Sequence, residues 1–402
     1  MKKLVSLENL IYLIVFSLPL YLIREQVLFL RTNVLENLIM GAFIWWLIVF
    51  FKYAKIENFY FEYRRYLVCG ALIVTGFFWA AFSNGQALQS LSIIKSWLIF
   101  PLILLFVAAD VLPQERLKNI FLVYAASTFL VAVISIGYLL LGHLTYDGRL
   151  MAFFNSPNYL AMYLAPGVLM SLWARTFLKW KMKMALVFLA VLLVALFFTY
   201  SYAAFGAVFL SSLVVLWMAK MRIPSGSSRH LFLKEILAAG LIFILFFAAQ
   251  AGNDKFSNIW ELRSRSSLAS RAMIWQASSR MVKDNLITGI GAANFQKTYL
   301  AYQKFFPPYL EWAVPHPQNI YLAIWLFGGL LGAVGFLGLL FFFFRDLLKN
   351  KSQNSLEILA LGIMLYILLH GLFDTTYFKN DLAIVFWLNF LVLKKATGEL
   401  ES

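Results

Sequence analysis

The sequence has few charged residues, cysteines and histidines, and each shortage excludes a class of protein. Charged residues make up 13% of the 402 positions, where an average globular chain carries roughly 25%. A single cysteine, Cys69, leaves no disulfide framework and no cysteine-based metal site. The four histidines lack the spacing of metal ligands and stand at His143, His230, His316 and His370. No glycine-rich phosphate loop is present, so neither a metal nor a nucleotide cofactor is expected.

Apolar residues are in excess along the whole chain. They make up 62% of the sequence, and the mean hydropathy is +0.78. One soluble core cannot hide this excess, because single cores stop growing near about 250–300 residues. Solid apolar runs at 184–198, 231–249 and 320–344 also exclude the alternating strands of an outer-membrane barrel. We therefore expect an all-α integral membrane protein.

Twelve stretches are apolar enough to be transmembrane helices, on the criterion of about 20 apolar residues per span. They lie near 8–23, 34–51, 66–83, 90–109, 117–141, 158–176, 184–200, 202–219, 232–250, 318–344, 355–371 and 381–394. The chain thus divides into nine spans in 1–250, a hydrophilic segment at 251–317 and three spans in 318–402. Ionisable residues inside the spans are scarce, and Lys95 is the clearest of them, which weighs against an ion-coupled transporter.

Lysine and arginine set the expected orientation. With the N-terminus inside, most basic residues outside 251–317 fall on the inner side, as the positive-inside rule requires. Both termini are then cytoplasmic, and 251–317 is the one long extracytoplasmic segment. The formal net charge of +15 reflects these short basic loops, and no nucleic-acid partner is expected.

The segment 251–317 is too long to be a plain connector, since loops beyond about 12–15 residues are usually functional or disordered. We expect Ser270 to cap an amphipathic helix over Arg271–Lys283, with a break at Thr288–Gly291. Its apolar stripe consists of Ile274, Ala277, Met281 and Val282. Such a helix against an apolar bundle is typical of a lid or an interfacial element.

Arginines gather in this segment. Arg263, Arg265 and Arg271 fall within nine residues, and guanidinium groups match phosphate oxygens bidentately. The cluster could hold a diphosphate. The alternative, which composition alone favours slightly, is contact with anionic membrane lipids.

Two further sites contain histidine. His316 stands between Pro315 and Pro317, which fix the backbone where the chain re-enters the membrane, and a neutral imidazole can act as a general base. His370 and Asp374 are four residues apart, a spacing that allows a proton relay if the helix continues, although a local hydrogen bond that closes the helix is slightly favoured. The polar turn at 155–158 is interpreted first as a helix start.

Four blocks of sequence together resemble the O-antigen ligase and polymerase superfamily of membrane glycosyltransferases. In chain order the blocks are Phe153–Ala161, Thr199–Ala204, Arg271–Trp275 with Asp284–Phe295, and Pro315–Leu322 with Phe327–Gly332; the tail His370–Asp374 with Tyr377–Asp381 fits as well. The resemblance covers nearly the whole chain.

The resemblance implies a fold similar to that of GT-C glycosyltransferases and a location in the bacterial inner membrane. It implies transfer of a glycan from an undecaprenyl-diphosphate carrier to an acceptor hydroxyl, on a glycan or a lipid, at the outer face. Arg271 matches a family arginine that engages the diphosphate, and His316 falls in the motif that contains the proposed base. The further candidate residues for substrate binding are Arg263, Arg265, Tyr202, Arg149, Asn319, Asp374 and His370.

The sequence departs from the family pattern at two positions. An arginine is common where Tyr202 stands, and the fourth block often reads His-x-His-Asn where this chain has Gln318. Ligase and polymerase therefore both remain open, as does a protein O-oligosaccharyltransferase. The alternatives outside this class are a lipid-linked glycan flippase without chemistry, which should show pseudo-symmetric halves, and a scaffold that only binds glycan-assembly proteins.

Overall fold

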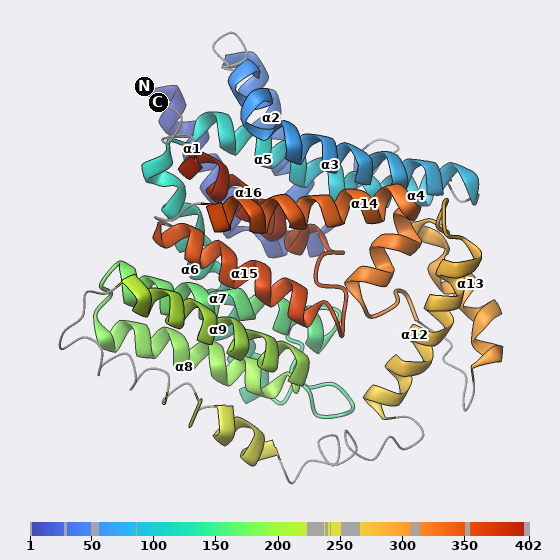
Figure 1. Cartoon of the computed structure of the whole chain (residues 1–402). Coiled ribbons are helices and arrows are strands. Elements are labelled where there is room, and N and C mark those ends of the chain that lie inside the picture. The colour runs from blue at the N-terminus through green and yellow to red at the C-terminus, as the bar shows by residue number, and fades with distance from the viewer. Residues whose placement is uncertain are drawn as a thin grey trace.

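Helices make up nearly all of the regular structure in the computed structural model (Figure 1). The structure describes residues 2–27, 30–49, 56–85, 87–222, 237, 240–241, 243–250, 266–306, 314–349 and 354–397. The first half contains α1 (Lys2–Phe16), α2 (Val34–Val49), α3 (Ile56–Ser83), α4 (Ala87–Ile94), α5 (Phe100–Val111), α6 (Leu117–Leu140), α7 (Pro157–Phe177) and α8 (Met182–Phe198). The second half contains α9 (Tyr202–Arg222), α12 (Ser267–Asp284), α13 (Phe295–Tyr302), α14 (Ile320–Lys349), α15 (Ser355–His370) and α16 (Asn380–Thr397).

Short elements connect these helices. A 3-10 turn, η1 (Leu18–Leu22), leads into an antiparallel pair of strands, β1 (Arg24–Val27) and β2 (Leu30–Asn33), in which Arg24 is opposite Asn33. A π-helical turn, Lys95–Ile99, joins α4 to α5. Other 3-10 turns lie at Gln114–Arg116, Ala292–Asn294 and Gln303–Phe305.

Five helical segments among the described residues are long and apolar enough to cross a membrane. They are Tyr63–Ser83, Ala87–Val111, Gln114–Leu140, Tyr202–Met221 and Ile320–Lys349. Shorter apolar helices lie at Ser6–Phe16, Val34–Val49, Met182–Phe198, Ser355–His370 and Asn380–Val392. The chain is therefore an all-helical, polytopic membrane protein. The count of twelve spans remains a prediction, and the span expected at 232–250 lies partly outside the described residues.

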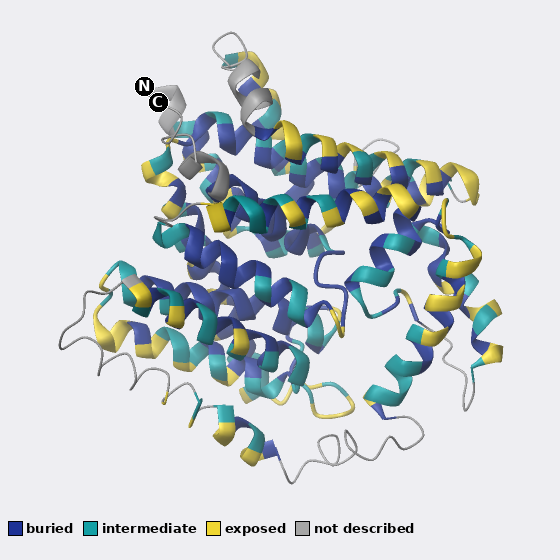
Figure 2. Cartoon of the chain, in the orientation of Figure 1, coloured by how far each residue is buried: buried dark blue, intermediate teal, exposed yellow. Residues whose placement is uncertain are grey.

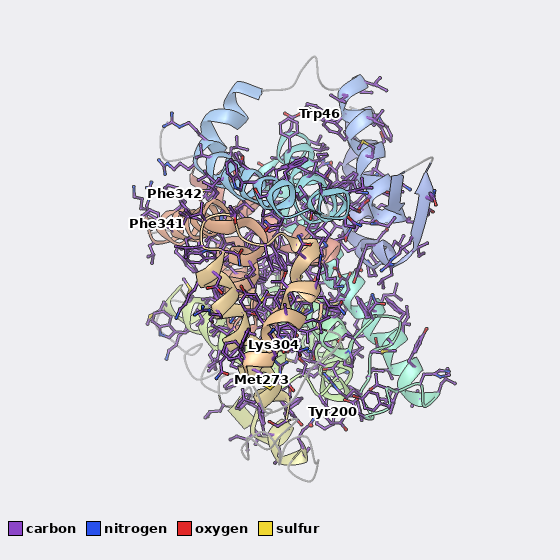
Figure 3. All side chains as sticks on the ribbon, turned by 90° about the vertical axis from the view of Figure 1, so that its right-hand side faces the viewer. Trp46, Tyr200, Met273, Lys304, Phe341 and Phe342 are labelled. Atoms are coloured by element: carbon purple, nitrogen blue, oxygen red, sulfur yellow. The ribbon has the colours of Figure 1, made fainter. Side chains whose placement is uncertain are left out.

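The helices pack as a bundle whose two ends differ. α3 contacts α14, α15 contacts α9, and α7 contacts α6, α8, α9 and α15. In Figure 1 the start of α1 lies at the left-hand end of the bundle, whereas α12 and α13 lie at the right-hand end. Buried residues follow the interior of the bundle in Figure 2, and exposed ones follow its rim. Phe341 lies at the outer edge in Figure 3, and Trp79 and Phe82 are likewise exposed apolar side chains that suit a lipid surface.

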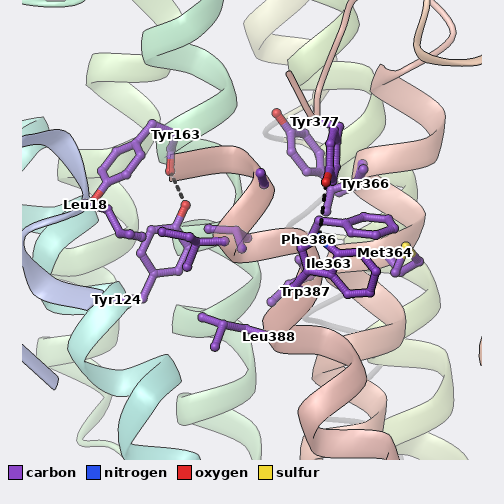
Figure 4. Close-up of a cluster of buried hydrophobic side chains, with 14 of the residues drawn as sticks. Leu18, Tyr124, Tyr163, Ile363, Met364, Tyr366, Tyr377, Phe386, Trp387 and Leu388 are labelled. Carbon is purple, nitrogen blue, oxygen red and sulfur yellow. Dashed lines mark hydrogen bonds between the residues drawn. The ribbon is translucent and has the colours of Figure 1, made fainter. Parts of the chain in front are cut away.

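Buried aromatic side chains fix the centre of the bundle (Figure 4). The hydroxyl of Tyr124 in α6 donates to the carbonyl of Tyr163 in α7 over 3.1 Å, and the two rings meet edge to face. The indole of Trp387 donates to the hydroxyl of Tyr377 over 3.1 Å, and that hydroxyl donates to the carbonyl of Trp97 over 2.6 Å. These bonds attach the 371–379 loop to α16 and to the π-helical turn.

The span predicted at 318–344 is α14, and it contains a kink. Gly329 interrupts it with non-helical angles, φ 61° and ψ −157°. The turn after α12 docks on this kink, because Leu330 N donates to Ile287 O over 3.0 Å and Ile290 N donates to Leu326 O over 2.7 Å. A Cβ on Gly329 would collide with the carbonyl oxygen of Ile287, so only glycine fits here.

The cap predicted for the amphipathic helix is wrong by one turn. α12 begins at Ser267, and the hydroxyl of Ser266, not Ser270, accepts from Ala269 N over 3.1 Å. The predicted apolar stripe is largely confirmed, since Ile274, Ala277 and Met281 are buried while Val282 is partly buried. The opposite face, with Gln276, Ser279, Arg280 and Lys283, is exposed.

Candidate functional site

A cavity of about 670 Å³ lies where α7, α9 and α12 begin and α15 ends. The polar residues that line it are Arg149, Asn158, Tyr200, Ser201, Tyr202, Ser267, Ser270, Arg271 and Gln318. Its remaining lining is mostly apolar and includes Ala203, Gly206, Ala207 and Leu210, which are spaced to form one stripe along α9. The cavity therefore combines a cationic polar end with an apolar groove, and the groove reaches Leu210, whose side chain is exposed on the bundle surface.

Arg149 is held against the hairpin between α8 and α9. Its Nε donates to Thr199 O over 2.8 Å, and its Nη2 donates to Asn158 Oδ1 over 2.6 Å. Burial lowers the pKa of Arg149 from its ordinary value, and the like charge of Arg271 acts in the same direction. The guanidinium nevertheless stays charged, because an arginine pKa starts far above neutrality.

Asn158 connects this arginine to the loop after α15. The α7 N-terminus is set by Ser156, whose hydroxyl accepts from Asn158 N over 3.2 Å, and by Pro157 at the first helical position. The Asn158 side chain then points at the loop, where its Nδ2 donates to Asp374 Oδ2 over 2.9 Å. The polar turn at 155–158 is thus a helix start, as predicted, and also part of the cavity wall.

Asp374 is the buried anion of this arrangement. Burial by itself raises its pKa, but Arg271, together with His316 and His370 in their protonated forms at acid pH, outweighs that effect. Thr375 N also donates to Asp374 Oδ1 over 2.8 Å, so the net result is a pKa below the ordinary value. Asp374 is therefore a carboxylate that balances the cationic end of the cavity.

Arg271 reaches the same loop from α12. Its Nε donates to Phe373 O over 2.8 Å, and its Nη1 contacts the backbone and hydroxyl of Ser267. Burial lowers the pKa of Arg271, and Asp374 opposes this. No described residue accepts a hydrogen bond from Arg271 Nη2 or from Arg149 Nη1, so both guanidinium groups keep donors for a ligand.

His316 lies beside the cavity, because Val314 and Gln318, two residues before and after it in the sequence, line the cavity. Its Nε2 is 3.0 Å from the hydroxyl of Tyr159 in α7. Its Nδ1 is buried and has no hydrogen-bond partner among the described residues. Burial lowers the pKa of His316; the positive charges of Lys379 and Arg271 lower it further, and Asp374 opposes them. The imidazole is therefore neutral near pH 7, with one nitrogen available.

The other candidate residues lie at or near this end of the bundle. The Asn319 side chain caps α14 by accepting from Tyr321 N over 3.0 Å, and it donates to Leu372 O over 3.0 Å. The hydroxyl of Tyr202 donates to Gln250 Oε1 over 3.0 Å. Arg263 and Arg265 lie outside the described residues.

His370 and Asp374 do not form one helical face, because α15 ends at His370. His370 Nδ1 bonds instead with the hydroxyl of Tyr366 at 2.9 Å. The backbone of Asp374 donates to His370 O over 3.1 Å, which closes the helix end, as the favoured interpretation predicted.

Two contacts of the site were missed in the sequence. Tyr159 follows the polar turn directly, yet its contact with His316 spans 157 positions. Lys379 places its ammonium 4.0 Å from the centre of the Tyr159 ring, a cation–π contact. The Tyr159 contact could have been suspected, because Tyr159 lies in the first turn of a helix that starts at the cavity. Nothing in the sequence indicates that Lys379 contacts Tyr159.

The comparison with known families agrees with the motif analysis. Residues 185–337 match the family described as O-Antigen ligase. This range runs from α8 into α14, and it includes the α8–α9 hairpin, Arg271 and His316. No curated protein matches the chain. Over residues 185–337 this match supports the resemblance to the O-antigen ligase and polymerase superfamily.

Proposed function

We propose that this chain, a membrane protein of the O-antigen ligase superfamily through its residues 185–337, transfers a glycan from an undecaprenyl-diphosphate carrier to an acceptor hydroxyl at the outer face of the membrane. One observation carries the proposal. Two guanidinium groups with available donors, Arg149 and Arg271, face a cavity that continues into an apolar groove, and a neutral imidazole lies beside it.

The two arginines hold the diphosphate in this proposal. When the glycosyl bond to the phosphate oxygen breaks, the bonding electron pair leaves with the diphosphate, and fixed cations offset the negative charge that develops. No metal is required for this stabilisation. Arg149 also accounts for the departure at Tyr202, since its guanidinium lies on the hairpin where related chains commonly carry an arginine and contacts Thr199 O.

His316 serves as the base. We assign its Nε2–H to the hydrogen bond with the Tyr159 oxygen, which leaves the lone pair on Nδ1 for the incoming proton. The acceptor oxygen attacks the anomeric carbon, its proton passes to Nδ1, and the diphosphate departs from the opposite side. This single displacement inverts the anomeric centre, and proton transfer of this kind typically contributes about 10²–10⁴-fold in rate.

The apolar groove along α9 suits the polyprenyl tail. Gly206 has open space where a side chain would be, because nothing lies within 4 Å of a Cβ built there. Since α9 is one of the helices able to cross the membrane, a tail in this groove would pass directly into the lipid phase. One amphiphilic donor would therefore occupy both parts of the cavity, with its diphosphate at the polar end and its hydrocarbon chain in the groove.

Purified protein in liposomes that contain an undecaprenyl-diphosphate-linked glycan and an acceptor tests the proposal. Formation of a new glycosidic bond, with the inverted configuration seen by NMR, is expected. Movement of the donor between leaflets without a new bond would instead identify a flippase. Mass spectrometry of surface glycans from cells with and without the gene separates the two transferase types, since loss of long chains indicates a polymerase, and accumulation of carrier-linked full-length chains indicates a ligase.

A further inference from the structure

A second cavity, of about 580 Å³, lies at the same end of the bundle and shares no lining residue with the first. It is lined by η1, β1 and β2, the start of α2, the end of α4, the π-helical turn and the start of α16. Its polar lining consists of Arg24, Thr32, Asn33, Glu36, Ser92, Ser96, Asn155, Lys379 and Asn380, and its aromatic lining of Tyr21 and Trp97. It is larger than a water site and falls in the size range of ligand pockets.

The start of α7 separates the two cavities. Asn155, just before this helix, lines the second cavity, while Asn158 lines the first. Lys379, which also lines the second cavity, lies 4.0 Å from the Tyr159 ring centre, and the hydroxyl of Tyr159 is 3.0 Å from His316 Nε2. These two contacts connect the lining of the second cavity to His316 through Tyr159.

The charge in the second cavity is positive. Glu36 is neutralised by Lys95, at 2.7 Å, and it also accepts from Ser96 and Asn380. Arg24 and Lys379 form no ion pair within the described part of the chain. Two cations without an ion pair in the described residues, among amides, hydroxyls and an indole, are suited to a saccharide that carries an anionic group, although the carboxyl of Asp381 acts on Lys379.

The wall of this cavity is also preorganised. Lys95 and Ser96 belong to the π-helical turn between α4 and α5, a type of distortion that is frequent at functional sites. Both side chains hold Glu36, and Glu36 in turn holds the amide of Asn380 beside Lys379. Buried polar groups that bind one another in this way keep the wall rigid without a ligand.

We propose that the second cavity binds the acceptor, a saccharide with a carboxylate or phosphate group, with its anion on Arg24 and Lys379. This inference rests on the proposed function.

Binding without any donor tests the site apart from catalysis. The full-length protein in detergent is titrated with three probes: an oligosaccharide that contains a uronic acid or a sugar phosphate, its neutral counterpart, and inorganic phosphate. We expect the charged saccharide to bind at least about tenfold more tightly than the other two, the ratio that corresponds to one good charge-assisted contact. Equal binding of the neutral sugar would overturn the anionic assignment, and equal binding of phosphate alone would overturn the saccharide assignment.

Amino-acid substitutions test whether the charged saccharide binds in the second cavity. Arg24→Gln and Lys379→Gln should each weaken binding of the charged saccharide about tenfold, Lys379→Arg should largely restore it, and Lys283→Gln on the exposed face of α12 should have no effect. In transfer assays the first two variants should raise the KM for the acceptor and leave the KM for the donor unchanged. Unchanged binding in both variants would overturn the proposal. Normal binding by a protein that transfers nothing would refute the proposed function and leave the saccharide site in place.

Discussion

At the scale of single residues, the proposed mechanism makes the environment of His316 set how activity depends on pH. Burial lowers its pKa below the ordinary 6.5. The base form is the neutral imidazole, which predominates above the pKa, so activity is present at neutral pH and is lost as the pH falls through the lowered value. We expect the acidic limb of kcat/KM to lie below pH 6.5 when initial rates are measured across pH 4.5–8.5, as roughly half-maximal activity marks the pKa. An acidic limb above pH 7 would exclude His316 as the base.

Removal of the imidazole gives the most direct prediction at this scale. His316→Ala should lower kcat by about 10²–10⁴-fold while the KM for the donor changes little, because the base acts in the transition state. Transfer by the purified, folded variant is the measurement. His143→Ala is the matched control, since His143 is exposed in the loop after α6. Undiminished transfer by His316→Ala would remove the assignment.

Two arginines on α12 allow a test of whether the helix makes a specific contact with the lipid-linked donor or only adds positive charge. Arg271 is bound to Phe373 O at the cavity, whereas Arg280 is exposed and pairs with Asp284. Arg271→Ala should raise the apparent KM for the lipid-linked donor about tenfold or more, and Arg280→Ala should leave it nearly unchanged. Equal effects in a donor titration would indicate that the helix only attracts anionic lipids.

At the scale of elements, glycines let the turn after α12 dock on the kink of α14. Gly329 has a positive φ of 61°, and a Cβ there would meet the carbonyl of Ile287. Gly329→Ala should therefore destabilise the protein by about 1–3 kcal/mol and lower the Tm in detergent. Gly137→Ala in α6 is the control: no atom lies within 4 Å of its Cβ position, so its Tm should stay equal or rise. A Gly329→Ala Tm equal to that of the wild type would show that the kink is not constrained.

At the scale of the whole molecule, the distribution of basic residues predicts which end of the bundle is outside. In a background in which the buried Cys69 is replaced by serine, a membrane-impermeant maleimide should label Lys283→Cys in intact cells. Lys181→Cys and Lys349→Cys, both exposed positions, should be labelled only after permeabilisation. The reverse pattern would invert the predicted topology and place the candidate site on the cytoplasmic side.

The class of the fold was predictable because long apolar runs can satisfy their backbone hydrogen bonds in a membrane only as helices. The position of the α8–α9 break, the helix in the 267–284 region and the types of residue in the candidate site were predictable from local patterns. The kink at Gly329 and the cap at Ser266 were not, because both depend on what docks beside them.

Which residues face one another was decided by the tertiary structure alone. In a membrane helix apolar residues face lipid as well as protein, so hydrophobic periodicity does not identify the inner face. For this reason Glu36 passed unnoticed within a predicted span, although it pairs with Lys95. The sequence by itself determined a helical membrane protein with arginines and a histidine in its polar motifs. Only the packing of distant loops placed Arg149 on the hairpin and Lys379 over Tyr159, since those contacts join residues 50 and 220 positions apart.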